Sequence, residues 1–148
     1  MKLSTKGRYG LRAMLDLTAH AGAGRQSIQQ IAERQAVSVS YLEHLFSLLR
    51  KAGLVRSVKG AQGGYMLARA ADRMRVGDVL RALEGDLTLV EEPPADAPDA
   101  DALSRCIRRM VWDALDERLN RLVDGITLEE LAREQLVLEG RQPDTYHI

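Results

Sequence analysis

Long hydrophobic runs, aromatic side chains and paired cysteines are all missing or scarce in this sequence. No apolar run approaches the roughly 20 residues that a membrane-spanning helix needs, and the first ten residues, MKLSTKGRYG, lack the apolar segment of a signal peptide. The single cysteine, Cys106, has no partner within the chain for a disulfide. These absences predict a cytoplasmic protein, without contact to a membrane, in a reducing compartment.

The scarcity of aromatic residues also limits how the core is built. Only 4% of the chain is aromatic whereas 45% is apolar, so the core must consist mainly of aliphatic side chains. Such a composition favours packed helices. At 148 residues, the chain has room for one ordinary domain and an accessory element. We therefore expect a mostly α-helical protein.

The formal net charge is zero, but the charges are unevenly distributed along the chain. Residues 1–75 contain 13 Lys and Arg against 4 Asp and Glu, a balance of +9, whereas residues 76–148 carry a balance of −9. This asymmetry indicates that the first half binds a polyanion such as nucleic acid. Charges that merely solvate two surfaces are the alternative explanation.

Apolar residues recur at helical spacing in three segments near the start of the chain. The pattern predicts helices over about residues 5–21, 28–35 and 41–52. The last two predicted helices begin at capping boxes formed by Ser27 with Gln30 and by Ser40 with Glu43. Only AVSV separates these two helices, which is a length typical of a helix-turn-helix unit whose second helix enters a DNA groove. An ordinary helical hairpin is the alternative.

A glycine-rich, basic hairpin follows the predicted helix-turn-helix. The runs LVRSV and YMLA, joined by KGAQGG, predict two strands over residues 54–68. A helix-turn-helix followed by such a hairpin, the wing, is a winged helix, here over residues 1–84. The tip glycines allow close backbone approach, and Lys59 supplies a charge for a phosphate or a narrow minor groove. A nucleotide-binding glycine loop does not fit, because YML continues as a strand and not as a helix.

The second half of the chain predicts an accessory helical element. After a short helix over residues 76–84 come an exposed, mobile acidic loop over 85–100, a long helix and a short final helix within 101–138, and a loosely held tail over 139–148. The long helix spans about 36 Å, more than one winged-helix body covers, so its apolar stripe is expected to pair with a second copy of the chain. Folding back along its own domain is the alternative. The stripe comprises Leu103, Ile107, Met110, Val111, Ala114, Leu115, Leu119 and Leu122.

Four segments, MKLSTKGRYGLRAMLDL, SYLEHLFSLLRKAGLVRSVKGAQGGYMLA, VGDVLRALEG and ITLEELA, closely resemble the Rrf-two family of bacterial winged-helix transcriptional regulators. The resemblance covers essentially the whole chain except the acidic loop and the tail. It implies a homodimer joined through the long helix. Each subunit is then expected to place its third helix in a major groove, and its wing at the adjacent minor groove, of a roughly palindromic double-stranded DNA operator.

Pattern and resemblance together define a set of expected DNA-binding residues on the first helix, the third helix and the wing. Lys59 stands where relatives often have arginine, and a lysine lacks the planar fork of a guanidinium. His44 replaces a glutamine of some members, which is expected to alter the base preference. The complete set is Lys6, Ser38, Ser40, Tyr41, Glu43, His44, Ser47, Arg50, Lys51, Lys59, Gly60, Gly63 and Tyr65.

The resemblance departs from the cluster-binding members of the family at the acidic loop. Those members hold a 2Fe-2S or related cluster on three cysteines, whereas this chain has only Cys106, at the position of the last one, and Arg109 where a histidine is expected. One thiolate without other soft ligands is a poor cluster site. We therefore predict no metal and no cofactor, as in the CymR-like members; a cluster-sensing regulator of the same family is the alternative.

Cys106 is interpreted first as a small buried apolar residue of an amphipathic helix. The alternative is a redox-sensing thiol, favoured if the neighbouring Arg105 and Arg109 stabilise the thiolate. The sequence alone leaves both interpretations open.

The predicted function is that of a sequence-specific transcriptional regulator, a repressor in sulfur, cysteine or iron–sulfur metabolism. A regulator that acts through protein contacts is the second candidate. The resemblance to CymR-like members implies a cysteine-synthesising enzyme as partner, with contacts from Tyr146, His147 and Ile148 in the tail. The protein is not expected to be an enzyme, because no nucleophile is paired with a nearby histidine and no cofactor fingerprint is present.

Overall fold

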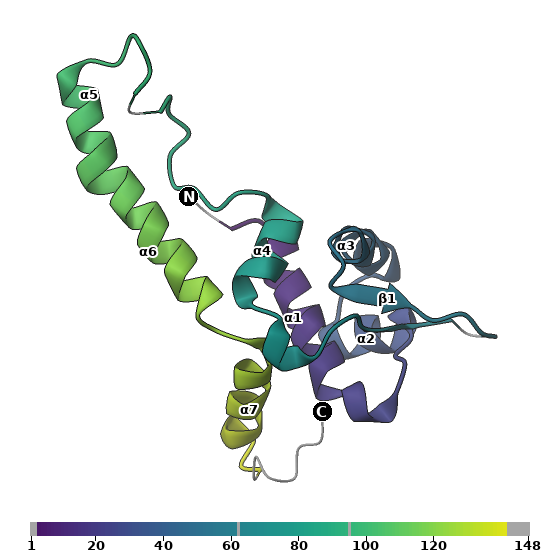
Figure 1. Cartoon of the computed structure of the whole chain (residues 1–148). Helices are drawn as coiled ribbons and strands as arrows, with labels where there is room; N and C mark the ends of the chain where they lie inside the picture. The colour runs from purple at the N-terminus through teal and green to yellow at the C-terminus, as the bar shows by residue number, and fades with distance from the viewer. Residues whose placement is uncertain (1–2, 62, 95, 142–148) are drawn as a thin grey trace.

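The computed structural model describes residues 3–61, 63–94 and 96–141, so the predicted tail contacts at residues 146–148 lie outside the described residues. The prediction of a mostly α-helical winged helix-turn-helix fold with a long C-terminal helix is confirmed (Figure 1). The elements labelled η1 and η2 are short turns of 3-10 helix, and η3 is a short π-helix. The elements are α1 (Thr5–Ala19), η1 (Ala21–Ala23), α2 (Ile28–Gln35), α3 (Val39–Lys51), β1 (Val55–Ser57), β2 (Tyr65–Leu67), η2 (Ala71–Arg73), α4 (Val76–Glu84), α5 (Ala102–Ile107), η3 (Arg108–Trp112), α6 (Asp113–Asp124) and α7 (Leu128–Leu138).

Serine caps determine where the two helices of the helix-turn-helix begin. The Ser27 hydroxyl accepts the Gln30 amide at 3.1 Å and the Gln30 side chain accepts the Ser27 amide at 2.9 Å, as predicted. The capping box predicted at Ser40 and Glu43 is wrong, because Ser38 is the N-cap of α3 and accepts a backbone amide at 3.1 Å. Ser38 has an extended backbone (φ −69°, ψ 147°), so the helix begins directly after it.

A cluster of apolar, mainly aliphatic side chains holds α1, α2, α3, α4 and the hairpin together. The inward face of α3 contributes four buried side chains to this cluster. Burial of each such side chain contributes about 1.5–3 kcal/mol to the stability of the fold. This packing fixes which face of α3 points outward. Its fully buried members include Met14, Leu17, Ile31, Leu42, Leu45, Phe46, Leu49, Leu54, Met74, Val79 and Leu128.

A buried ion pair fixes α1 against α2. Asp16 is only 6% exposed and accepts three hydrogen bonds from Arg34, from Nε to Oδ1 at 3.2 Å and to Oδ2 at 3.0 Å, and from Nη2 to Oδ1 at 2.7 Å. Gln35 also donates to Asp16, at 2.7 Å, and Arg34 donates to the Gln26 side chain at 2.9 Å. A buried carboxylate needs such partners, because an unpaired charge would strongly destabilise the fold. The network joins α1, α2 and the segment before α2, in which Gln26 pairs with Tyr65 at the base of the wing.

The long helix predicted over residues 101–124 is present but is not uniform. The π-helical η3 lies between α5 and α6, so the helix continues in one direction while its side-chain register shifts (Figure 1). Arg108 in η3 donates to Asp113 at 3.0 Å and to the Glu92 carbonyl at 2.8 Å. The helix projects from the winged-helix body and leaves most of its apolar stripe exposed, so the alternative of folding back along its own domain is wrong.

The acidic loop over residues 85–100 contains no helix or strand in its described part. Residues 91–94, in its proline-rich acidic part, are exposed, whereas Leu87 and Leu89 before them are packed. The Leu89 amide donates to Asp116 at 2.8 Å, and Leu87 is buried in a second cluster. The buried members of that cluster are Val76, Leu80, Leu87 and Val123.

A polar contact attaches α4 to the end of α6. Arg81 donates to both carboxylate oxygens of Asp124, at 2.8 and 2.7 Å, and to Asn120 Oδ1 at 2.7 Å. The hydrogen bond from Arg81 lowers the pKa of Asp124, and the same contact raises the pKa of Arg81. Gly77 leaves room for the pair, since a Cβ atom there would lie 1.9 Å from Asp124 Oδ1.

The final helix α7 returns to the winged-helix body. It begins at a capping box of Thr127 and Glu130, and the Leu128 amide donates to the Met74 carbonyl at 2.9 Å. Leu128, Ala132 and Leu136 form its buried face. In the described part of the chain, no helix has the length and apolar character needed to cross a membrane.

Candidate nucleic-acid interface

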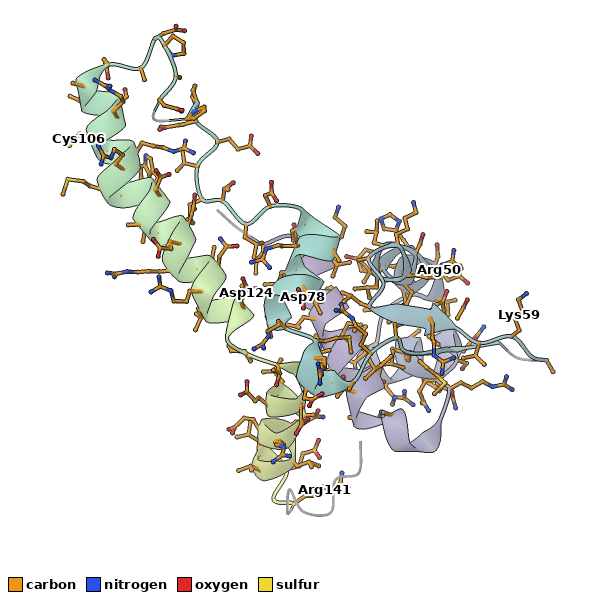
Figure 2. The ribbon with its side chains drawn as sticks, in the orientation of Figure 1. Arg50, Lys59, Asp78, Cys106, Asp124 and Arg141 are labelled. Carbon is orange, nitrogen blue, oxygen red and sulfur yellow. The ribbon has the colours of Figure 1, made fainter. Side chains whose placement is uncertain are left out.

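The outward face of α3 is polar, opposite the face that is buried in the core. In Figure 2, α3 and its labelled Arg50 lie on the side of the body away from α5 and α6. Hydroxyl, carboxylate and imidazole groups on an exposed helix can bond to base edges in a major groove. The outward residues are the exposed Ser40, Glu43, His44, Arg50 and Lys51 and the half-buried Ser47.

The amino-terminal ends of α1 and α3 lie together. The Tyr41 hydroxyl is 3.0 Å from Thr5 Oγ1, and the Tyr41 ring meets the Tyr9 ring edge-on with centroids 6.2 Å apart. Ser38, exposed at the N-cap of α3, and the half-buried Lys6, in the first turn of α1, lie at these two ends. The N-terminus of a helix attracts phosphate, because its free backbone N–H groups and the helix dipole favour a negative charge.

The wing is a two-stranded hairpin that extends past its last paired residues. Ser57 pairs with Tyr65, and beyond them the Val58 amide donates to the Gly64 carbonyl at 2.8 Å. The Gly63 amide donates to the Gly60 carbonyl at 3.1 Å, and Gly63 has a φ of +61°, a left-handed conformation that favours glycine. Lys59 is exposed, and Figure 2 shows it far out on the hairpin.

Tyr65 lies at the base of the wing and fixes the hairpin to the core. Its ring packs against Phe46 with the centroids 4.7 Å apart and the planes tilted by 49°. Its backbone exchanges two hydrogen bonds with Gln26, at 2.8 and 3.0 Å. Tyr65 is therefore placed to position the wing, in contrast to Lys59 near the tip.

The cations of this surface are not neutralised by the protein. Over the described ranges 3–61, 63–94 and 96–141, none of Arg50, Lys51, Arg56 and Lys59 forms an ion pair with a carboxylate. All four are exposed. Unpaired lysine and arginine side chains on one surface are what a phosphate backbone binds.

Sequence reasoning missed Arg25, in the connection between η1 and α2. Its Nη1 donates to the carbonyl of Lys59 at 3.3 Å. The local sequence AGAGRQS indicated only a helix break. A contact between a side chain and the backbone 34 residues further along the chain has no local signal in the sequence.

Cys106 is exposed, so the interpretation as a buried core residue is wrong for the single chain. The physical reason is that α5 projects from the body and no other part of the described chain covers this face. Cys106 lines an open depression together with Asp96, Ala102, Arg105, Arg109, Met110 and Asp113. Among the described residues, no group of three or more His, Cys, Asp and Glu side chains has an arrangement that could hold a metal ion.

The predicted apolar stripe of the long helix is largely exposed in the single chain. Leu103 is 70% exposed, Met110 74% and Leu122 63%, and Ile107, Val111 and Leu115 are also exposed. Ala114 is half-buried, and Leu119 packs partly against the second cluster. An apolar surface of this extent indicates an interaction site.

Comparison with known proteins agrees with this geometry. A family model named Rrf2 and described as "Iron-dependent Transcriptional regulator" matches residues 3–134. The chain is 42% identical over 144 residues to the HTH-type transcriptional regulator IscR of Erwinia tasmaniensis, covering 96% of this chain and 86% of that protein. These descriptions are those of transcriptional regulators and not of enzymes.

Two solved structures share the fold along most of their length. CymR (YrzC), titled the global cysteine regulator of B. subtilis, is 40% identical with a TM-score of 0.75, over 89% of this chain and 96% of that one. IscR of T. potens is 42% identical with a TM-score of 0.72, over 91% of this chain and 88% of that one.

Proposed function

Because the chain belongs to the Rrf2 family of DNA-binding transcriptional regulators, we propose that it acts as a homodimeric repressor of sulfur, cysteine or iron–sulfur metabolism genes in the cytoplasm. The observation that carries the proposal is the outward polar face of α3 beside a wing whose cations are unpaired. A twofold dimer matches a palindromic operator, since each protomer contacts one half-site.

The residues of α3 supply two kinds of contact. Glu43 is suited to accept a hydrogen bond from the amino group of cytosine, and His44 and Ser40 can donate to or accept from neighbouring base edges. Arg50 and Lys51, at the other end of the helix, are suited to phosphates and orient the protein without reading sequence. Lys59 carries the wing contact to the adjacent minor groove or its phosphates.

The test is a fluorescence-anisotropy titration at several salt concentrations, with a duplex selected from a random pool by the unaltered protein. The logarithm of the binding constant should fall linearly with the logarithm of the salt concentration. Lys59→Ala should reduce the magnitude of this slope by about 0.9, because Lys59 neutralises one phosphate. Arg133→Ala on α7 removes the same charge away from the proposed interface and should leave the slope unchanged. Equal affinity for the selected and a scrambled duplex at moderate salt would refute the proposal.

The homodimer part of the proposal rests on the exposed stripe of α5 to α6. A monomer that exposed Leu103, Met110 and Leu122 to this degree would present a long apolar surface to water. Pairing with a second copy covers the same face on both chains with one contact.

An iron–sulfur cluster does not fit the donor set at the corresponding place. Cys106 is the single cysteine of the chain, and the charged side chains around it are guanidinium groups and hard carboxylates. The same depression also contains Ala102 and Met110, but a thioether is a weak ligand and does not replace the missing thiolates. We therefore expect colourless protein after purification without oxygen, whereas a brown product with visible absorbance would contradict this expectation. For the redox alternative, operator affinity of the unaltered protein should fall after mild peroxide treatment and that of Cys106→Ser should not.

A second candidate, regulation through a protein partner, is favoured by the end of α7. Val137 and Leu138 are exposed there, directly before the tail. A cysteine-synthesising enzyme is the partner class that we expect from the family resemblance. Pull-down with that enzyme should succeed with the full chain and fail after deletion of residues 142–148 while DNA binding persists; no capture by the full chain would exclude it.

A further inference from the structure

The wing is held in place by a side chain from outside the hairpin. Arg25 precedes Gln26, whose backbone bonds to Tyr65 at 2.8 and 3.0 Å, so the segment before α2 runs antiparallel beside the base of β2. From this position the Arg25 side chain extends along the hairpin, and its Nη1 donates to the Lys59 carbonyl at 3.3 Å.

The glycines of the wing are matched to this side chain. A Cβ atom at Gly64 would lie 3.4 Å from the Arg25 Cβ, and one at Gly60 would lie 2.3 Å from its Nη1. Arg25 thus occupies the space beside both arms of the hairpin, first next to Gly64 and then next to Gly60. Two glycines that allow many backbone conformations are thereby covered by one extended side chain.

Resting on the DNA-binding function proposed above, we infer that Arg25 is a positioning residue that fixes the direction of the wing and so presents Lys59 to DNA. A glycine-rich tip without this support samples many conformations and loses that freedom on binding, which weakens the complex. Arg25 acts through the Lys59 backbone, and its own charge is not what binds the duplex.

Arg25→Ala separates positioning from a direct phosphate contact. We expect the affinity for the selected duplex to fall about fivefold to tenfold, the effect of one lost hydrogen bond and a less ordered wing, with an unchanged salt slope. Arg25→Lys keeps the charge but lacks the guanidinium and should restore little of the affinity. Arg69→Ala, an exposed arginine beyond β2, is the matched control and should bind normally. A salt slope reduced by about 0.9, or full rescue by Arg25→Lys, would overturn the inference in favour of direct contact.

A double-mutant cycle tests the contact itself. Gly60→Ala places a methyl group on the Arg25 guanidinium and displaces it, and the strain from the Gly60 φ of +155° is common to both backgrounds and cancels. The affinity loss from Gly60→Ala should therefore be smaller in Arg25→Ala than in the unaltered chain. Additive losses would contradict the inference.

Hydrogen exchange on the free protein keeps the inference testable even if the chain binds no duplex. In Arg25→Ala, the amide of Val58, which bonds across the wing, and that of Gly63, which bonds to Gly60 within the tip, should exchange faster than in the unaltered protein. Arg69→Ala should leave both unchanged. Unaltered exchange in Arg25→Ala would show that the wing holds its conformation without Arg25 and would overturn the inference. Failure of DNA binding by the unaltered protein, with faster exchange in Arg25→Ala, would instead refute only the proposed function.

Discussion

A charge placed in the stripe of α5 to α6 should separate the proposed dimer. Complete burial of a large apolar side chain contributes about 1.5–3 kcal/mol, so covering Met110, which is 74% exposed, contributes about 1–2 kcal/mol in each protomer. Met110→Asp removes this contribution twice, a loss of about 2–4 kcal/mol before the cost of burying two carboxylates is added. At 1.4 kcal/mol per factor of ten, the dissociation constant of the dimer should rise at least about thirtyfold.

Sedimentation velocity over a dilution series measures this dissociation constant, and circular dichroism confirms that the variant stays folded. Leu138→Asp is the matched control, because Leu138 is 79% exposed but lies on α7 outside the stripe, and it should leave the dimer unchanged. Operator affinity should fall in parallel with dimerisation. A folded Met110→Asp variant that dissociates no more readily than the unaltered protein would refute the assignment of this stripe as the dimer contact.

Three further predictions follow from the junction of α4 with α6 and from α3. Asp124→Asn should lower the free energy of unfolding at pH 7 by about 0.5–1 kcal/mol, a figure discounted for solvent screening because the Asp124 side chain is 44% exposed. Since Arg81 lowers the pKa of Asp124, this contribution is complete above about pH 4 and is lost as the pH falls through the folded-state pKa; an equal difference at neutral and strongly acidic pH in thermal denaturation would contradict it. Gly77→Ala, whose Cβ would lie 1.9 Å from Asp124 Oδ1, should cost about 1–3 kcal/mol in urea denaturation, and less when Asp124→Ala is also present. His44→Gln should change which base is preferred in a selection from random duplexes, with about 1–3 kcal/mol of discrimination between the bases at that position. An unchanged preference would show that His44 does not contact a base.

The features that could be predicted from the sequence are those with short-range patterns. Helical spacing, the Ser27 box and the glycine-rich hairpin each depend on neighbouring residues, and the structure confirms these elements. The start of α3 was mispredicted because both Ser38 and Ser40 are good N-cap residues, and the choice between them depends on the backbone of the preceding turn. The turn itself uses Ala36 at φ 55°, a left-handed conformation with no local signal in an alanine.

The features that could not be predicted depend on pairs of residues far apart in the chain. The contact of Arg25 with the wing, and that of Arg81 with Asp124, join segments 34 and 43 residues apart. The exposure of Cys106 depends on α5 projecting from the body, because the amphipathic pattern around this residue is the same for a helix covered by its own domain and for one that is not.

The position of α4 determines how the long helix is attached to the winged-helix body. Arg81 binds the end of α6, and Glu84, one turn later, accepts the amides of Ser4 at 3.0 Å and Gly7 at 2.9 Å at the start of α1. Burial raises the pKa of Glu84, but the hydrogen bonds from Ser4 and Gly7 outweigh it and lower the pKa, so the carboxylate is charged at neutral pH.

This arrangement fixes how the outward face of α3 is placed relative to α5 and α6, and so it would determine the geometry of the proposed dimer. The start of α1 also holds α3, through Thr5 and Tyr41. From the dimer contact to the outward face of α3, the path therefore crosses packed helices and hydrogen-bonded side chains and no flexible linker. Because each protomer is one such unit, the distance between the two α3 helices depends on the crossing angle of the long helices, and the half-site spacing of the operator follows from that angle. An operator whose half-sites are moved apart by half a helical turn would place the second α3 on the opposite side of the duplex, which no local adjustment of the wing can compensate.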